Sequence, residues 1–140
     1  MTAVPGIRRV VETALYVDDM ERAVRFYRDV LGLAPMSVGE RLSAFDAGGE
    51  TVLLLFRRGA TREGFTWPGG FIPPHDGSGP MHVAFAVDLA GLESWESALT
   101  ERGVMVESRV RWERGGRSLY VRDPDGHSVE LVTPGTWANY

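Results

Sequence analysis

The feature that most constrains the fold is a pattern of one strand, one helix and three strands that occurs twice along the chain. In the first copy, a β-branched segment at 8–17 ends at an acidic pair that can cap a helix. Apolar residues then recur at helical spacing as far as Gly32, which suits the position after a helix. Strand-like segments follow near 34–38, 41–46 and 51–56.

The second copy begins at 81–87, where an apolar run again ends at an aspartate. An amphipathic segment follows and ends at Gly103, as the first helix ends at Gly32. Further strands are predicted near 104–111, 117–122 and 128–133. Such a repeat indicates two copies of one supersecondary unit.

These patterns predict an α+β fold in which two tandem βαβββ modules form a curved, cup-like mixed sheet with helices on the outer face. The 140 residues suit one domain. We assign the first module to 8–56, a connecting loop to 57–80 and the second module to 81–133.

Composition excludes several kinds of chemistry. The chain has no cysteine, which rules out disulfides and thiolate ligands, and its fifteen basic residues are all arginine, which rules out a lysine Schiff base. The formal net charge of −4, without a basic stripe, argues against nucleic acid as a partner. No apolar run is long enough to cross a membrane, and Met1–Ile7 lacks a secretion-signal pattern. We therefore expect a cytoplasmic protein.

Three ligand-type side chains share the face of their strands that lies opposite the bulky apolar residues: Glu12, His82 and Glu130. Small or modest neighbours such as Ala14, Ala84 and Ser128 flank them, which leaves room for a pocket. Each residue taken alone is typical of a solvated strand face or of an ordinary polar residue. Their shared face on equivalent strands favours one concave site.

Converging carboxylates need a cation, an arginine partner or a shared proton. A divalent metal held by one imidazole and two carboxylates would meet this need, and such ligands suit Mn, Fe, Ni, Co or Zn, among which the sequence does not choose. We therefore predict Glu12, His82 and Glu130 as metal ligands, with Glu12 or Glu130 also acting in catalysis.

The loop 57–80 carries three aromatic residues and is either a linker or an ordered apolar wall at the pocket mouth. His75 in this loop is read as a loop residue, and His127 is expected outside the metal site because it is off-register. The predicted pocket wall comprises Tyr16, Phe65, Trp67, Phe71, Trp112 and Tyr120.

Three segments carry a family resemblance: ETALYVDDMERAVRFYRDVLGL at 12–33, HVAFAV at 82–87 and RSLYVRDPDGHSVEL at 117–131. With them the chain resembles the vicinal oxygen chelate superfamily, which includes glyoxalase I, fosfomycin-resistance enzymes, extradiol dioxygenases and bleomycin-binding proteins.

The resemblance implies metal ligands on the first, fifth and eighth strands, at Glu12, His82 and Glu130. Glu12 departs from the histidine or glutamine that many members carry there. Alignment of Gly49 on Gly126 places Leu53 opposite Glu130, so the fourth-strand glutamate of glyoxalase I-like enzymes is missing. A ligand set with one histidine also argues against an extradiol dioxygenase, because the resemblance implies two histidine ligands for that kind of enzyme.

We expect a metal-dependent lyase or isomerase of glyoxalase-like type, acting on a small substrate that binds the metal through oxygen atoms. The alternative is a metal-free protein of bleomycin-resistance type that sequesters a drug or metabolite, and an extradiol-type dioxygenase is a more distant possibility. The resemblance also implies a homodimer. The sequence leaves open the substrate, the reaction, and whether one chain or two form the cup.

Overall fold

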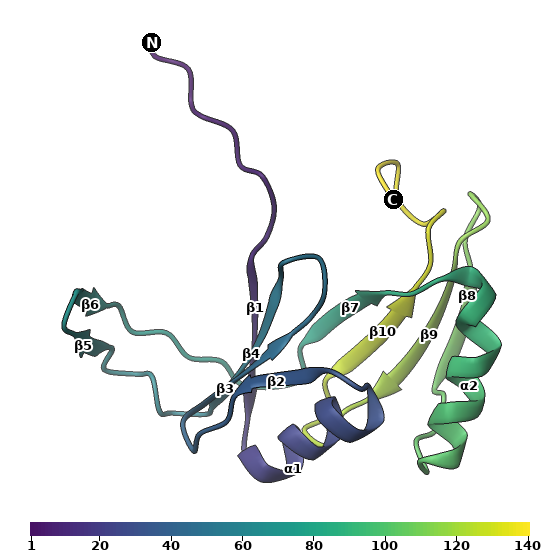
Figure 1. The fold of residues 1–140 in the computed structure, drawn as a ribbon, viewed down its shortest axis with the longest axis horizontal. Helices are drawn as coiled ribbons and strands as arrows, with labels where there is room; N and C mark the ends of the chain where they lie inside the picture. The colour runs from purple at the N-terminus through teal and green to yellow at the C-terminus, as the bar shows by residue number, and fades with distance from the viewer.

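The computed structural model describes all 140 residues, and its first half has the predicted order of strand, helix and three strands (Figure 1). The predicted first strand is shorter than expected, because residues 8–11 lie exposed before it. The elements of this half are β1 (Glu12–Val17), α1 (Met20–Arg25), the π-helix η1 (Phe26–Val30), β2 (Ala34–Ser37), β3 (Leu42–Asp46) and β4 (Val52–Arg57).

The second half repeats this order. Its second strand is also shorter than expected, since residues 104–107 precede it without strand structure. Its elements are β7 (His82–Ala86), the 3-10 turn η2 (Leu89–Gly91), α2 (Leu92–Glu101), β8 (Ser108–Arg111), β9 (Arg117–Arg122) and β10 (Ser128–Val132). No helix has the length and apolar character required to span a membrane.

Each half forms its own four-stranded mixed sheet, with the orders β1-β4-β3-β2 and β7-β10-β9-β8. The first strand of each half is parallel to the last strand of the same half, and the remaining pairs are antiparallel. The α+β class and the two βαβββ modules are thus as predicted. Within one chain, β1 and β7 are edge strands, and no hydrogen-bonded ladder joins the two sheets.

One face of each sheet contributes to a single apolar core. Leu15 and Val17 of β1 are buried in it together with Val129 and Leu131 of β10, so both halves share the core. The period-2 alternation of strand side chains sends the opposite set of residues to the other face. Each sheet therefore has one face packed in the core and one face available for a site.

The first helix begins and ends as the sequence predicts, but it changes type midway. The Asp19 carboxylate accepts a hydrogen bond from the Arg22 amide at 3.0 Å, which caps α1. After Arg25 the helix widens to a π-helix, and Gly32 adopts a left-handed conformation with φ of 74°. The widened turn buries Tyr27 completely.

The loop between the halves contains an element that the sequence analysis did not predict. Strands β5 (Phe65–Trp67) and β6 (Gly70–Ile72) pair as a short hairpin, which projects away from both sheets (Figure 1). Their side chains are largely exposed. We call this hairpin the aromatic arm, after its residues Phe65, Trp67 and Phe71.

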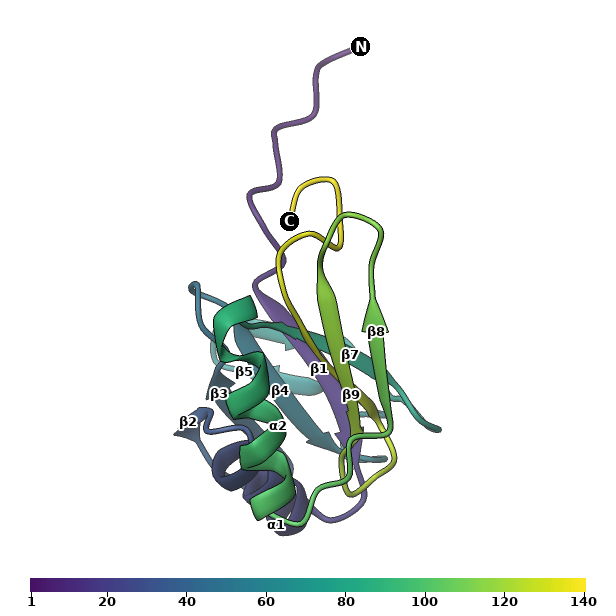
Figure 2. The ribbon, with the colours of Figure 1, turned by 90° about the vertical axis from the view of Figure 1, so that its right-hand side faces the viewer.

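The turn 123–127, before β10, ties the second half to the first. The Asp123 carboxylate accepts a hydrogen bond from the Tyr27 hydroxyl at 2.7 Å, and the Asp125 carboxylate accepts one from the Asp18 amide at 2.8 Å. The C-terminal end of α2, the helix that faces the viewer in Figure 2, also reaches the first half, because Arg102 Nε donates a hydrogen bond to the carbonyl of Asp29 in η1 at 3.1 Å. These contacts hold the two modules in one orientation.

Candidate metal and substrate site

His82 and Glu130 meet on the free face of the second sheet. They lie on the neighbouring strands β7 and β10, and His82 Nε2 is 3.3 Å from Glu130 Oε1. The other ring nitrogen of His82 lies 3.0 Å from the carbonyl oxygen of Ser128, which fixes the orientation of the imidazole. This juxtaposition was expected from strand parity alone.

Glu130 is only 7% exposed, although it is a carboxylate on a sheet face. Its second oxygen accepts a hydrogen bond from the Ser118 hydroxyl at 2.5 Å. Ser118 in turn accepts a bond from the indole nitrogen of Trp112 at 2.8 Å. This relay leaves Oε1 as the oxygen that faces His82, so the carboxylate has one atom to offer to a ligand or metal.

Tyr120 completes the surroundings of this pair. Its ring is roughly parallel to the His82 ring, with centroids 6.4 Å apart. Burial, and then the nearby Glu130 carboxylate, raise the pKa of the Tyr120 hydroxyl. The hydroxyl therefore remains protonated and able to donate a hydrogen bond beside Glu130 at neutral pH.

Glu12 does not join this pair within one chain. It lies on β1, on the free face of the first sheet, and no group of three histidine, aspartate or glutamate side chains in the structure is close enough to hold a metal ion. The three predicted ligands are therefore divided between the two sheets, two on one and one on the other.

Glu12 instead lines a cavity of about 580 Å³ on the first sheet. Phe65 and Trp67 of the aromatic arm form one wall of this cavity, whereas Phe71 does not line it. Leu54 and Phe56 of β4 lie at its floor, and the rest of its lining comprises Arg41, Leu42, Thr61, Gly64, Ile72, Pro73 and His75. The loop thus forms a wall of this cavity, which is one of the two interpretations that its sequence left open.

The residue of the first half that is equivalent to Glu130 is Leu54. The expected equivalence of Leu53 with Glu130 is therefore wrong by one residue. Glu12 pairs with Val52 as His82 pairs with Ser128, so Leu54 and Glu130 each lie two residues beyond the paired residue. Leu53 is instead buried in the core. The fourth carboxylate remains absent, because Leu54 is also apolar.

The remaining wall residues divide between the two halves. Tyr16 lies beside His75 and Phe56 in the first half, with its hydroxyl 2.5 Å from His75 Nδ1. Trp112 and Tyr120 belong to the second half, as described above. Of the two other histidines, His127 is fully buried and bonded on both ring nitrogens, so it is outside the site as expected.

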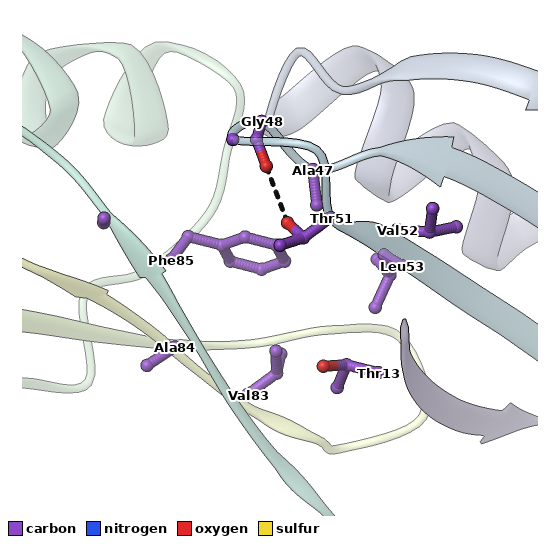
Figure 3. A pocket seen from close by; sticks show the side chains of 11 residues that line it. Thr13, Ala47, Gly48, Thr51, Val52, Leu53, Val83, Ala84 and Phe85 are labelled. Carbon is purple, nitrogen blue, oxygen red and sulfur yellow. Dashed lines mark hydrogen bonds between the residues drawn. The ribbon is translucent and has the colours of Figure 1, made fainter. Parts of the chain in front are cut away.

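A further cavity, of about 450 Å³, lies between the halves (Figure 3). The turn that carries Gly48 and Thr51 faces Phe85 and Val83 of β7 across it, and its lining includes no ionisable side chain. It offers no acid, base or metal ligand. Of the two cavities described, only the one on the first sheet is lined by ionisable side chains.

The residues that the sequence analysis missed are Ser118 and His75. Ser118 shares strand parity with Tyr120, which could have placed it on the site face. For His75 the loop sequence contains no periodic signal.

Comparison with known proteins gives the family. Residues 9–131 match the model of the Glyoxalase/Bleomycin resistance protein/Dioxygenase superfamily. The chain belongs to this superfamily. The match covers both modules and the loop between them, so the predicted resemblance is confirmed.

Among relatives, the chain is 31% identical to the metallothiol transferase FosB of Shouchella clausii, over 84% of this chain and 74% of that protein. It is 30% identical to FosB of Staphylococcus epidermidis, over 84% and 77% of the two chains. A lactoylglutathione lyase structure from Agrobacterium tumefaciens superposes with a TM-score of 0.85 at 34% identity, over 96% of this chain and 99% of that one.

Proposed function

We propose that the protein is a divalent-metal-dependent enzyme of the superfamily's glyoxalase-like type, acting on a small substrate that binds the metal through oxygen. The observation that carries this proposal is the buried Glu130 carboxylate, held by Ser118 and aimed at His82 Nε2 at 3.3 Å. The relatives support it, because they are named a metallothiol transferase and a lactoylglutathione lyase.

The His82–Glu130 pair fits a divalent cation in chemistry and geometry. An imidazole nitrogen and a carboxylate oxygen are both common metal ligands, and Mn, Fe, Ni, Co or Zn would suit them. Each ligand already has a partner that orients it, Ser128 for the imidazole and Ser118 for the carboxylate. Such supporting contacts are typical of metal sites.

A second copy of the chain would supply the third ligand. Glu12 lies on the free face of β1 and His82 on the free face of β7, and both strands are sheet edges. Two copies related by a twofold axis can place β1 of each beside β7 of the other, which forms two equivalent sites. We therefore propose a homodimer in which each site uses His82 and Glu130 of one copy and Glu12 of the other.

The carboxylates would then have different tasks. A bound metal ion would act as a Lewis acid on the substrate oxygens. Glu130 is held by Ser118, so it would remain in place as a ligand. Glu12 is exposed at the cavity and bears no comparable clamp, so it is the better group to accept a proton from the substrate. Tyr120 would donate a hydrogen bond to an oxygen beside Glu130.

The first test is metal content, measured by elemental analysis of protein purified without a metal-binding tag. Wild type should carry close to one metal ion per chain, and His82→Ala should lose it. Protein that is free of metal and ignores added Mn, Fe, Ni, Co and Zn would contradict the proposal. The apolar cavity would then favour a metal-free binding protein for a drug or metabolite.

A mixed dimer tests the sharing of the site between two copies. When Glu12→Ala and Glu130→Ala chains are co-expressed and isolated as the heterodimer, one site has all its ligands and the other lacks both carboxylates. We expect one metal ion per heterodimer and weak binding in either homodimer. If one chain formed the whole site, both sites of the heterodimer would be defective.

A further inference from the structure

The backbone of His75 and the side chain of the next residue are held in place by hydrogen bonds within the loop. The backbone amide of His75 donates to the carbonyl of Thr61 at 3.1 Å, and the Thr61 hydroxyl donates back to the carbonyl of His75. The next residue, Asp76, accepts bonds from the Gly59 amide at 3.1 Å and from Arg62 Nε at 2.7 Å. The loop is therefore anchored at His75 and at the residue that follows it.

The imidazole of His75 is oriented by a tyrosine on the first sheet. Tyr16 is 8% exposed, and His75 Nδ1 is the acceptor that the structure provides for its hydroxyl. A buried hydroxyl proton without an acceptor is costly, so Tyr16 donates to Nδ1. In a neutral imidazole the ring proton then resides on Nε2. His75 thus carries one hydrogen-bond donor that no protein group uses.

His75, which carries this donor, lines the same cavity as Glu12. Glu12 and Tyr16 lie on one face of β1, four residues apart, which separates them by about 13 Å in an extended strand. Between them the floor is Leu54 and Phe56, and the wall is the aromatic arm. The His75 ring packs edge-on against Phe56, with centroids 4.6 Å apart. The cavity therefore has polar groups at its Glu12 and His75 ends and an apolar stretch at Leu54 and Phe56 between them, and Arg41 and Thr61 are its other polar lining residues.

We propose, on the basis of the function proposed above, that His75 is a specificity-determining residue that donates a hydrogen bond from Nε2 to the far end of the substrate. The substrate class that fits is elongated. It has oxygen donors at the Glu12 end, an apolar body along Leu54 and Phe56, and a neutral hydrogen-bond acceptor at the other end. A short polar oxyanion would leave the apolar stretch and His75 without contacts.

Two probe ligands test this inference on the metal-loaded protein. 2-Hydroxyoctanoate has a chelating head and an apolar chain, and 2-hydroxy-7-oxooctanoate adds one ketone acceptor near the tail. Isothermal calorimetry should show that the ketone binds about 3- to 10-fold more tightly, as expected for one neutral hydrogen bond. In His75→Phe, which retains a ring against Phe56, this preference should disappear while 2-hydroxyoctanoate binds as before.

Equal affinity of wild type for the two probes, or a preference that survives in His75→Phe, would overturn the inference and leave the metal site intact. Absence of metal-dependent binding for both probes would overturn the proposed function, and this inference with it. If His75→Phe does not fold, the imidazole ¹⁵N shifts of wild type decide. The ketone alone should perturb Nε2 of His75, and the same response to both probes would contradict the proposal.

Discussion

His127 Nε2 and the carbonyl oxygen of Tyr16 are 2.8 Å apart, a contact that joins residues 111 positions apart in the chain. The other ring nitrogen, Nδ1, accepts a bond from the Met81 amide at 2.8 Å, so Nε2 must carry the proton and donate to Tyr16. The imidazole is therefore neutral and fully bonded. It joins the first strand of one half to the start of the other half.

Replacement of His127 by leucine should destabilise the protein severely. Two backbone groups, the partly buried Met81 N–H and the buried Tyr16 carbonyl, would lose their hydrogen-bond partner, at a cost of about 1–3 kcal/mol each. Chemical denaturation should show a loss of about 2–6 kcal/mol. With all proteins stripped of metal, His82→Leu is the matched control, because its ring is half exposed, and it should cost little stability. Equal losses in the two variants would contradict this role of His127.

Tyr27→Phe tests the second contact between the halves. The change leaves one oxygen of the buried Asp123 carboxylate without its donor, which should cost about 1–3 kcal/mol. Tyr140→Phe should cost less, because the Tyr140 hydroxyl donates over a longer 3.2 Å in a partly buried setting.

The same contact predicts a dependence on alkaline pH. Burial, and then Asp123, raise the pKa of Tyr27 far above its usual value. The protonated form is thus favoured in the folded state, so its contribution to stability is complete below about pH 10 and is lost as pH rises further. Unfolding free energies measured from pH 9 to 11 should fall more steeply in wild type than in Tyr27→Phe. Parallel curves would contradict the assignment.

Ser118→Ala should weaken metal binding while the fold is retained. The variant frees Oε2 of Glu130 and leaves the carboxylate able to rotate, and the loss of such a supporting bond typically costs about 10- to 100-fold in metal affinity. Ser108→Ala on the exposed edge strand β8 is the control. Competition with a chromogenic chelator measures both variants. An unchanged affinity in Ser118→Ala would show that Ser118 does not position the carboxylate.

The loop anchor at Asp76 should respond to acid. The hydrogen bond from Arg62, followed by that from the Gly59 amide, lowers the pKa of Asp76 to about 2. The ionised form is favoured in the folded state, so the anchor's contribution is present above about pH 4 and is lost as pH falls through about 2. The Gly59 amide shift should titrate with a midpoint near that lower value. A midpoint near 4, or the same titration in Asp76→Asn, would contradict the contact.

Gly77→Ala should displace the loop from the first sheet. A Cβ atom at position 77 would lie 2.5 Å from Cδ2 of Tyr16 and 2.3 Å from Cε of Met81, and the tyrosine ring has little freedom to move. Such overpacking typically costs about 1–3 kcal/mol. Gly69→Ala is the control, because a Cβ atom at position 69 would lie at an ordinary contact distance of 3.8 Å from Cδ1 of Trp67. A crystal structure of Gly77→Ala that retains the Tyr16–His75 bond would show that the loop tolerates the added methyl group.

The sequence was most informative where side chains alternate along strands. Parity placed Glu12, His82 and Glu130 on the faces opposite the core, and it separated buried Val129 and Leu131 from the site. Parity could not show that the site face of the first sheet, with Glu12, and the site face of the second sheet, with His82 and Glu130, do not meet within one chain. That separation depends on how the modules pack, which strand periodicity does not encode.

Glycine was a misleading marker for the alignment of the two halves. Glu50, with φ of 62°, occupies the left-handed position that Gly126 fills in the second half, so alignment of Gly49 on Gly126 shifts the register by one residue. The aromatic arm was missed for a related reason. Its two strands have three residues each and flank a Pro68-Gly69 dipeptide, a composition that is typical of a loop.

The equivalence of Leu54 and Glu130 shows how the two copies of the repeat have diverged. Glu12 and His82 are the first residues of β1 and β7, and they pair with Val52 of β4 and Ser128 of β10. Two residues further along these last strands, β4 has a leucine and β10 has a carboxylate. In the proposed site the second half supplies the supported His82–Glu130 pair, and the first half supplies Glu12 and the largely apolar cavity beside it. If the function is as proposed, substitutions at Leu54 and Phe56 would change which substrates fit, while the His82–Glu130 pair on the other sheet would keep its supporting contacts.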